Sequence, residues 1–488
     1  MSPSVVRHRF FFVMSRKLLL HCVALSLAAL SPRAATAAAS SVTPRYQAVW
    51  VDAFHDGFKT PEQTRTLIEW ARRHNVNALF VEMRKAGDAY YQSRIEPVAA
   101  DVAPPGYDPL SDLLGQAHDT RGGKQRIEIH AWLIVYRIGT SERAPAGHVA
   151  AQHREWLSQT YGGSRKDEND SFLDPGIPEV IAHTDRVVAD LVTHYDLDGI
   201  HFDRIRYPGK QWGYNPSAVT RFRTIARRLL RPRPDDEAWS EFRRQQVSMM
   251  LRRLFMTTKA IRPNVKVSAA TIAFDECKAD FQQSRAFWDV FQDWQTWVRA
   301  DLLDLNIPMI YKRDHVSEQA RDYRGWLDFL ALNRGTALPI VGLGSFINSP
   351  AGSLRQISLA YQHPELAGVC LFSYAQLARE GDGTSLLTDD LRLRYFTPGA
   401  PVPKLPSPGE TPLGWIAGYV TGTKNDYAEV LLETKPPRPT HTDGGGFFAF
   451  TRVPVGEYQV SVSTSRSRKV TQTVRVTAGK VAALRLTP

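Results

Sequence analysis

Eight short apolar stretches alternate with helix-like sequence between residues 45 and 397, and this alternation limits the fold more than any other feature of the chain. Continuous apolar strands separated by helices are typical of a parallel sheet covered by helices. Eight such units over roughly 350 residues predict an α/β fold, a (β/α)8 TIM barrel, with a doubly wound open sheet as the alternative. The predicted strands are Ala48–Phe54, Ala78–Met83, Ile127–Tyr136, Gly199–Ile205, Val265–Thr271, Leu302–Tyr311, Leu338–Phe346 and Gly368–Tyr374.

The first predicted helix begins at a recognisable cap. Thr60 suits the N-cap, Pro61 suits the first helical position, and Gln63 would close a capping box back to Thr60. The apolar face expected to pack on the sheet consists of Leu67, Ile68 and Ala71.

Long connections follow three strands, and in a barrel they emerge at the rim that carries catalytic residues: Arg84–Pro109, Tyr136–Pro178 and Tyr207–Pro263.

The N-terminus has the pattern of a secretory signal. Basic residues precede an apolar run from Leu18 to Leu30, and Ala35-Thr36-Ala37 offers a small-x-small cleavage site. We therefore expect residues 1–39 to be a signal peptide and the protein to be exported, either periplasmic or secreted. Its removal lowers the formal net charge from +11 to +6, which gives little reason to expect a nucleic-acid partner. No apolar run reaches the roughly 18–20 residues of a transmembrane segment.

The C-terminal part of the chain differs from the barrel. Residues 398–413 are rich in proline and predict a stiff linker. Residues 414–488 show short alternating strands separated by turns such as Asp443-Gly444-Gly445-Gly446, which predicts a small all-β sandwich. The expected strands are Trp415–Val420, Ala428–Glu433, Phe447–Phe450, Glu457–Thr464 and Val481–Leu486. The stretch TDGGGFFAFTRVPVGEYQVSV resembles carboxypeptidase regulatory-like domains, which implies attachment or substrate proximity and no catalytic residues.

Cysteine and histidine spacing gives no sign of a metal centre. Beyond the signal segment the chain keeps Cys277 and Cys370, and two buried free thiols are expected, with a disulfide as the alternative. Neither a CxxC nor an HxxxH spacing occurs, so no built-in zinc site is expected and no cofactor is implied. An acid-rich barrel rim that holds calcium stays open.

The segment YDLDGIHFDR carries the clearest chemical signal. Alternate side chains of a strand share a face, so Ile200 and Phe202 would face the helices while His201 and Asp203 point into the barrel. Asp203 comes at the carboxyl end of the strand, where barrels present catalytic groups. The structural alternative is an Asp203 that simply pairs with Arg204 or Arg206.

Other strands bring further polar and aromatic residues to the same rim. On the second strand Phe80, Glu82 and Arg84 share a face, where Glu82 and Arg84 could form an interior ion pair instead of serving chemistry. Asp88 follows in an expected exposed loop, Gly87–Tyr91. Carboxylates among aromatic rings are typical of a sugar-binding cleft. The inner faces of strands 1 and 3 would add Trp50, Asp52, His130, Trp132 and Tyr136.

The barrel resembles the glycosyl-hydrolase-like family 10 proteins. The matching segments run in order through residues 45–397: AVWVDAF, NALFVEMRKAGDAYY, EIHAWLIVYR, FLDPGIPEV, YDLDGIHFDRIRYP, LDLNIPMIY and GVCLFSY. The resemblance implies a bacterial envelope or secreted hydrolase, and one class of members cleaves peptidoglycan glycan strands that have lost their peptides. The expected partner is thus a polysaccharide or glycan strand.

The resemblance also assigns particular residues. Asp203 matches the acid that ends the family's strand 4 motif, Asp88 its GDA loop and Arg84 the arginine before that loop. Two positions depart from the pattern. Position 82 is more often Gln in the family, and Met309 and Ile310 stand where a polar residue is usual on strand 6, which leaves Tyr311 as the candidate there.

Glycoside hydrolysis needs one carboxyl group that protonates the leaving oxygen and another that attacks or activates water. We assign Asp203 as nucleophile or base and Asp88 as the first candidate proton donor, followed by Glu82, Asp52 and Glu380. Arg84 and Arg206 would position Asp203 or bind an acidic sugar. The remaining substrate-binding candidates are Trp132, Tyr136 and Tyr207, which would stack on sugar rings, together with Asp52, His201, Tyr311 and Glu380.

Two functions of other classes compete with hydrolysis. A non-catalytic carbohydrate-binding protein could retain the barrel after losing an acid, and Met309 and Ile310 favour this alternative. An envelope scaffold would act through residues 414–488. The sugar, the linkage, the stereochemical course and the oligomeric state do not follow from the sequence.

Overall fold

The computed structural model describes residues 42–139, 144–145, 147–379, 384–422, 425–463 and 469–488. The expected signal peptide, residues 1–39, and the candidate Glu380 lie outside the described residues. Among the described helices, none combines the length and the apolar character that crossing a bilayer requires.

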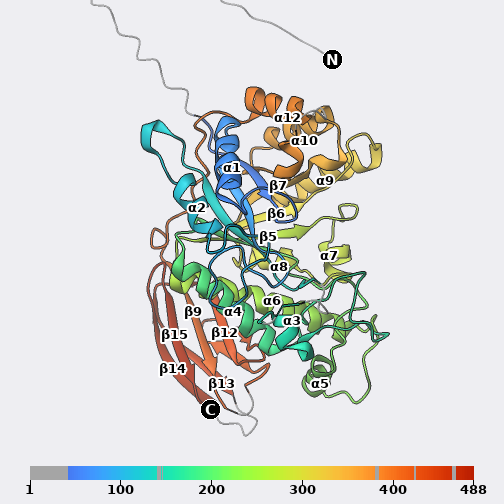
Figure 1. The fold of residues 1–488 in the computed structure, drawn as a ribbon. Coiled ribbons are helices and arrows are strands. Elements are labelled where there is room, and N and C mark those ends of the chain that lie inside the picture. Colours follow the sequence, from blue (N-terminus) through green and yellow to red (C-terminus); the bar gives the residue numbers. More distant parts are fainter. Residues whose placement is uncertain (1–41, 140–143, 146, 380–383, 423–424, 464–468) are drawn as a thin grey trace, which may run out of the picture. The chain divides into compact units, whose positions relative to one another are not determined.

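Eight strands form a closed barrel in the order β1 to β8, which confirms the predicted fold (Figure 1). Every neighbouring pair is parallel, including β8 with β1. Each strand lies within two or three residues of its expected position. The strands are β1 Tyr46–Val51, β2 Ala78–Arg84, β3 Glu128–Ile134, β4 Gly199–Asp203, β5 Lys266–Ile272, β6 Leu305–Met309, β7 Leu338–Gly344 and β8 Gly368–Phe372.

Helices connect the strands and cover the outside of the barrel (Figure 1). The long connection after β4 holds two helices, α5 and α6. The helices are α1 Pro61–Arg73, α2 Pro109–Ala117, α3 Val149–Gln152, α4 Pro178–His194, α5 Pro216–Ile225, α6 Glu237–Ile261, α7 Arg285–Trp288, α8 Trp294–Arg299, α9 Ser317–Leu332, α10 Pro350–Gln362, α11 Tyr374–Leu377 and α12 Thr384–Asp390.

Helix α1 has the expected start with one difference. Thr60 Oγ1 accepts a hydrogen bond from Gln63 N at 3.3 Å, and Pro61 occupies the first helical position. The Gln63 side chain, however, accepts from the backbone N–H of Lys59 at 2.9 Å and Gly57 at 3.2 Å instead of from Thr60. The Gln63 side chain thus bonds residues of the preceding loop and ties that loop to the start of the helix.

Side chains alternate between the two faces of the barrel wall. Ile200 and Phe202 belong to the core between strands and helices, while His201 lies in the interior beside Trp50, as the strand pattern predicted. Close packing explains a glycine at the start of β4, because a Cβ at Gly199 would lie 2.0 Å from the His130 ring. Cys277 and Cys370 are both free thiols, as expected, but only Cys370 is buried, whereas Cys277 is partly exposed.

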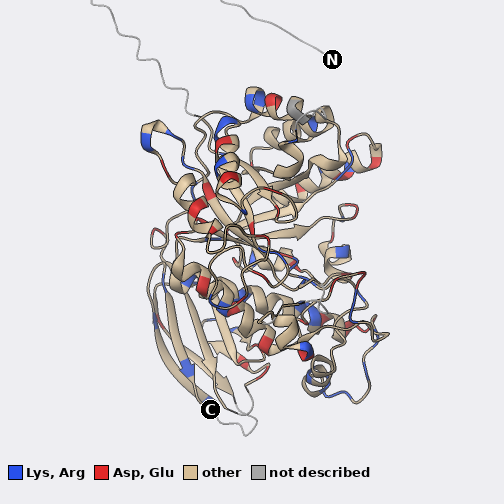
Figure 2. Ribbon diagram, viewed as in Figure 1, with Lys and Arg blue, Asp and Glu red and all other residues tan. Residues whose placement is uncertain are grey.

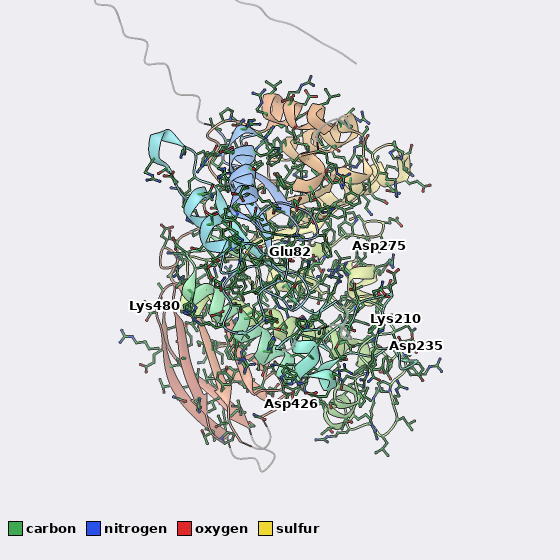
Figure 3. The ribbon with its side chains drawn as sticks, in the orientation of Figure 1. Glu82, Lys210, Asp235, Asp275, Asp426 and Lys480 are labelled. Atoms are coloured by element: carbon green, nitrogen blue, oxygen red, sulfur yellow. The ribbon has the colours of Figure 1, made fainter. Side chains whose placement is uncertain are left out.

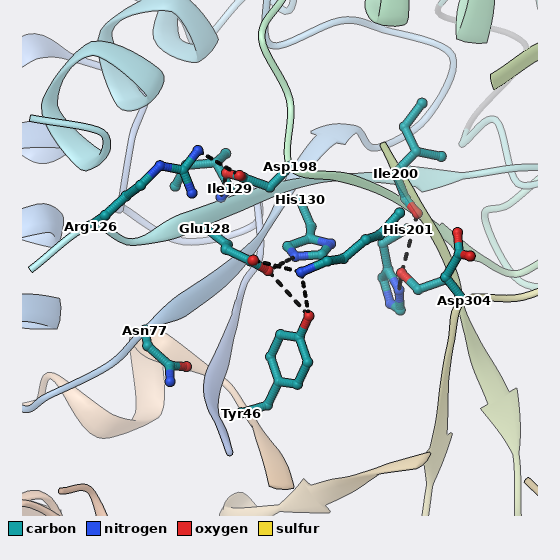
Figure 4. A network of polar contacts seen from close by, with 12 residues as sticks. Tyr46, Asn77, Arg126, Glu128, Ile129, His130, Asp198, Ile200, His201 and Asp304 are labelled. Carbon is teal, nitrogen blue, oxygen red and sulfur yellow. Dashed lines mark hydrogen bonds and ion pairs between the residues drawn. The ribbon is translucent and has the colours of Figure 1, made fainter. Parts of the chain in front are cut away.

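A polar network joins the amino ends of the strands (Figure 4). Glu128 accepts hydrogen bonds from Lys266 Nζ at 2.6 Å and from the Tyr46 hydroxyl at 3.2 Å, and it pairs with the His130 ring at 3.1 Å. Asp198 accepts from Arg126 at 2.6 Å and from the Ile129 N–H at 2.8 Å. These residues face away from the rim that holds Asp203, so they stabilise the barrel floor.

The proline-rich segment is part of this floor. Val402 and Leu405 pack against the interior apolar cluster that contains Tyr46 and Ile340. The backbone oxygen of Pro401 accepts from Arg45 N at 3.0 Å, and that of Ala400 accepts from Asn77 Nδ2 at 3.1 Å. The segment therefore covers the amino ends of the strands in addition to leading to the C-terminal strands.

The C-terminal residues form two sheets, as expected for a sandwich (Figure 1). One sheet has the order β11-β10-β13-β14 and the other β12-β9-β15. Two strands were not predicted, β11 and β14, and both are edges of the first sheet. The strands are β9 Leu413–Val420, β10 Glu429–Leu432, β11 Arg438–His441, β12 Phe447–Pro454, β13 Gly456–Ser463, β14 Lys469–Val476 and β15 Val481–Leu486.

Candidate active site

Three carboxyl groups gather at the carboxyl ends of barrel strands. Asp52 follows β1, Glu82 lies near the end of β2, and Asp203 ends β4. Glu82 is completely buried inside the barrel (Figure 3). Its burial, and then the nearby charges of Asp52 and Asp203, raise its pKa to about 8 against the opposing hydrogen bond from Ala53. Glu82 therefore carries a proton at neutral pH.

Two of these acids have an oxygen without a partner. Glu82 Oε2 accepts from Ala53 N at 2.7 Å, and Asp52 Oδ1 accepts from Phe54 N at 3.1 Å and pairs with the His55 ring at 2.7 Å. Within the described part of the chain, Glu82 Oε1 and Asp52 Oδ2 are buried and have no hydrogen-bond partner. Unsatisfied buried polar atoms are rare in native proteins, and here they mark a place where a ligand would complete the bonding.

The Asp203 carboxylate is held in place by hydrogen bonds to one of its two oxygens. Its Oδ1 accepts hydrogen bonds from the Arg204 N–H at 2.5 Å and from Arg206 Nη1 at 3.2 Å. The ion pair considered as the structural alternative is thus present. It is compatible with a role in chemistry, because it orients the carboxylate through one oxygen and leaves the other for a substrate.

His201 lies deeper in the barrel as a neutral ring. The Trp50 Nε1–H donates to His201 Nε2 at 3.1 Å, so the ring proton is on Nδ1, which bonds Ser268 Oγ at 2.9 Å. Burial lowers the pKa of His201 well below its usual value. His201 therefore supports the site from below, and both of its nitrogens are already bonded.

Arg84 and Asp88 lie elsewhere than the sequence suggested. Arg84 does not pair with Glu82 but with Glu96, through two bonds of 2.7 Å, and it also donates to the Val135 carbonyl at 3.1 Å. Glu96 is a buried acid on the long loop after β2, which sequence patterns did not single out. Arg84 therefore ties that loop to the end of β3.

The expected exposed loop at Gly87–Tyr91 is covered. Ala89 N donates to Pro97 O and Tyr90 N donates to Met83 O, at 2.8 and 2.9 Å, so the segment pairs with its own connection, and both tyrosines are completely buried. Asp88 accepts from the Ala86 N–H at 2.9 Å and stabilises this turn. Asp88 therefore serves the loop after β2 and is not a described partner of Asp203.

Aromatic side chains line the same rim. Trp132 packs near His201 and Phe372, and its Nε1–H is buried with no partner among the described residues. Tyr311 packs against Phe372 and Phe346, with ring centres 6.1 and 5.6 Å apart. Burial, and to a smaller extent the nearby charge of Asp203, raises the Tyr311 pKa well above its usual value. In contrast, Tyr136 and Tyr207 are at most 1% exposed and present no ring face to a sugar.

Some rim residues were missed by the sequence patterns. Phe54, Phe274 and Phe346 follow β1, β5 and β7 and are between 48 and 60% exposed. Phe54 and Phe346 had been placed inside strands, but those strands end at Val51 and Gly344. The Lys85 ammonium lies 5.5 Å from the Phe54 ring centre and close enough to Glu82 to act on its pKa. The Arg137 guanidinium lies at the same distance from the ring, but Asp170 neutralises it through two hydrogen bonds of 2.5 and 2.7 Å.

No group of three or more His, Cys, Asp or Glu side chains is arranged to hold a metal ion, as far as the described residues go. The residues that the structure does bring together are carboxyl groups and aromatic rings, which suit acid–base chemistry on a sugar.

Comparison with known proteins agrees with this geometry. The family model "Glycosyl hydrolase-like 10" matches residues 45–327. Glycosyl hydrolase YngK of Bacillus subtilis (strain 168) is 25% identical over 437 residues, covering 83% of this chain and 80% of that protein. Glycosyl hydrolase DigH of Escherichia coli (strain K12) is 28% identical over 347 residues, covering 62% and 73%.

Among solved structures, the PgaB (BpsB) glycoside hydrolase domain from Bordetella bronchiseptica matches with a TM-score of 0.52 and 16% identity. It covers 72% of this chain and all of that domain, a likeness that concerns the fold. The family match spans more than half of the sequence and the barrel strands from β1 to β6. The chain therefore belongs to the glycosyl hydrolase-like 10 family, as its motifs predicted.

Proposed function

We propose that this protein is a glycoside hydrolase that uses Glu82 as proton donor and Asp203 as nucleophile or general base. The observation that carries the proposal is the state of Glu82, which is buried, protonated at neutral pH and electrostatically coupled to Asp203 at the barrel rim. A donor with a raised pKa opposite a second carboxylate is what glycosidic bond cleavage requires.

In this mechanism the substrate oxygen receives the Glu82 proton as the bond to the sugar breaks. Asp203 attacks the sugar carbon or activates a water, and Arg206 holds it in position through Oδ1. The charge of Asp52 helps to keep the proton on Glu82 until the reaction. Compared with Asp88, Glu82 is the better candidate donor because Asp88 is engaged in its own turn.

For the substrate we propose a cell-envelope polysaccharide, in the first place peptidoglycan glycan strands without peptides. Two features support this choice. Exposed rings at the rim offer stacking surfaces for several sugars. Lys85 adds positive charge beside the acids, which suits a sugar that carries a carboxylate.

This substrate agrees with export of the protein to the periplasm or beyond, which we also propose from residues 1–39. N-terminal sequencing of the protein recovered from its native host tests this part. A terminus close to residue 40 supports export, whereas an intact Met1 contradicts it.

The reaction is tested by reducing-end release from peptide-free strands, intact peptidoglycan and neutral polysaccharides. We expect release from peptide-free strands, and a loss of about 10²–10⁴-fold in Glu82→Gln. An aryl glycoside of a short glycan with a good leaving group needs no proton donor, so Glu82→Gln should retain activity on it while Asp203→Asn loses activity on both substrates.

Asp88→Asn is the matched control and should retain activity within about tenfold. If Asp88→Asn instead loses activity on glycan strands and retains it on the aryl glycoside, Asp88 is the proton donor. If the protein binds glycan strands but cleaves none, and Asp203→Asn binds equally well, it is a carbohydrate-binding protein, the alternative that Met309 and Ile310 favour.

A further inference from the structure

The connection between α5 and α6 exposes two neighbouring leucines. Leu229 and Leu230 are 85 and 84% exposed. A lone exposed leucine is ordinary on protein surfaces, and Leu332 on α9, also 85% exposed, is one. Two adjacent leucines whose side chains are almost fully exposed form a small apolar patch that does not contribute to the packing of the fold.

The backbone around these leucines is fixed. Arg228 N donates to Arg223 O at 2.9 Å on one side. On the other, Arg231 Nη2 donates to Tyr161 O at 2.9 Å, and its guanidinium lies over the rings of Tyr161 and Tyr214 at 4.6 and 5.0 Å. The leucines are thus presented outward between two anchors.

Positive charge surrounds this patch, and we call residues 223–233 the basic tip (Figure 2). The tip contains no acid and five arginines: Arg223, Arg227, Arg228, Arg231 and Arg233. The acids come only afterwards. Asp236 pairs with Arg228 at 2.6 Å, and Asp235, labelled in Figure 3, pairs with Arg233 at 3.5 Å. Of the described carboxylates, none pairs with Arg227 or Arg231.

We propose that the basic tip docks on an anionic lipid surface. Arg227 and Arg231, which pair with no described carboxylate, would bind lipid phosphates. Leu229 and Leu230 would enter the boundary between headgroups and acyl chains, which is how basic and apolar residues together hold a protein at a bilayer. The leucines favour a lipid surface over a dissolved polyanion as the binding partner of the basic tip. A dissolved polyanion would satisfy the arginines alone, whereas only a surface with an apolar layer gains from two leucines.

Co-sedimentation with unilamellar vesicles tests the proposal. We expect the purified protein to bind vesicles of phosphatidylglycerol and phosphatidylcholine, to bind pure phosphatidylcholine much less, and to dissociate as salt rises. The double variant Leu229→Ser/Leu230→Ser should lose at least tenfold in affinity. Arg227→Gln should lose about fivefold, because one arginine near such a surface is worth about 1 kcal/mol.

Leu332→Ser is the matched control, since it removes an equally exposed leucine outside the tip and should leave binding unchanged. Circular dichroism of each variant confirms its folding, which exposed positions should not disturb. The proposal is overturned if the double leucine variant binds anionic vesicles as well as the original protein. It is equally overturned if the protein ignores vesicles, or binds dissolved polyphosphate as tightly as it binds them.

Discussion

Two buried glutamates on neighbouring segments, Glu82 and Glu96, behave in opposite ways. Burial favours the protonated form of both. In Glu96 the charge of Arg84 and the hydrogen bonds from Arg84 and His183 overcome burial and hold the pKa well below its usual value. Glu82 receives one backbone hydrogen bond and faces two other acids, so its pKa rises. The environment thus makes Glu96 a structural anion and keeps Glu82 protonated, as its proposed role as proton donor requires.

The state of Glu82 predicts how stability varies with pH. Its pKa is about 8 in the folded protein against 4.5 for an ordinary Glu. The folded state thus binds more protons than the unfolded state between these values, and stability falls as pH rises through that window. One pKa unit corresponds to about 1.4 kcal/mol, so ionised Glu82 costs several kcal/mol. Glu82→Gln should be more stable than the original at pH 9 and similar at pH 4, by denaturant titration. A pH-independent difference would contradict the raised pKa.

The proposed role of Glu82 also predicts how activity varies with pH. Because Glu82 must be protonated to act as a donor, we expect kcat/KM to decline above about pH 8. Measuring the pH profile on peptide-free strands and on the aryl glycoside checks this. The alkaline limb should be present with the strands and weak with the aryl substrate. An alkaline limb of equal size on both would mean that another group titrates.

At this scale the sequence was a partial guide. Alternation along strands placed Asp203 and Glu82 correctly inside the barrel, because the strand period is fixed by the backbone. The same spacing predicted that Arg84 and Tyr136 share the inner faces of their strands, but each lies at or beyond a strand end, where the period no longer applies. Tyr136 instead belongs to the core between strands and helices. Arg84 turns to Glu96, a partner from a loop whose course no local pattern defines.

At the scale of elements, strand interiors were predicted better than strand ends or edges. The barrel strands are continuous apolar runs, because both faces are buried. The two strands missed in the sandwich, β11 and β14, are sheet edges with few buried side chains. Their sequences, RPTH and KVTQTVRV, lack the apolar signal because one side of each strand has no neighbour to pack against.

The proline-rich segment should contribute to barrel stability. Val402 and Leu405 pack against the interior cluster at the barrel floor. The double variant Val402→Ser/Leu405→Ser should lose about 2–3 kcal/mol of unfolding free energy, measured by denaturant titration, because each side chain gives up part of its buried apolar surface. Lys404→Ser, an exposed position between them, is the control and should change little. Equal stability of all three proteins would show that the segment is only a spacer.

At the scale of the molecule, residues 42–488 form one compact unit. The sandwich shares a core with the barrel helices, since Ala417, Phe447 and Ala449 belong to the same apolar cluster as residues of α4 and α6. Trp415 contacts Phe255 of α6. Sequence composition separated barrel, linker and sandwich, but it did not reveal this contact, because the apolar face of α6 reads the same whether it packs on strands of the barrel or on a second sheet.

Arg253 on α6 is the centre of this contact. It donates to Asp185 of α4 at 2.9 Å and to the buried Asp443 of the sandwich at 3.2 Å, and its guanidinium lies over the Phe447 ring at 4.7 Å. Arg253→Ala would leave Asp443 buried without its cation, which costs about 3–5 kcal/mol. Arg452→Ala breaks an exposed pair with Asp301 across the same contact and should cost at most about 1 kcal/mol.

Scanning calorimetry distinguishes the possible consequences. If barrel and sandwich unfold together, the original protein gives a single transition, and Arg253→Ala moves that whole transition to lower temperature while Arg452→Ala barely moves it. This is the expected result, because the shared cluster makes the free energy of each part depend on the other. The original protein could instead give two resolved transitions, of which Arg253→Ala shifts only one. That result would show that the sandwich and the barrel unfold independently of each other.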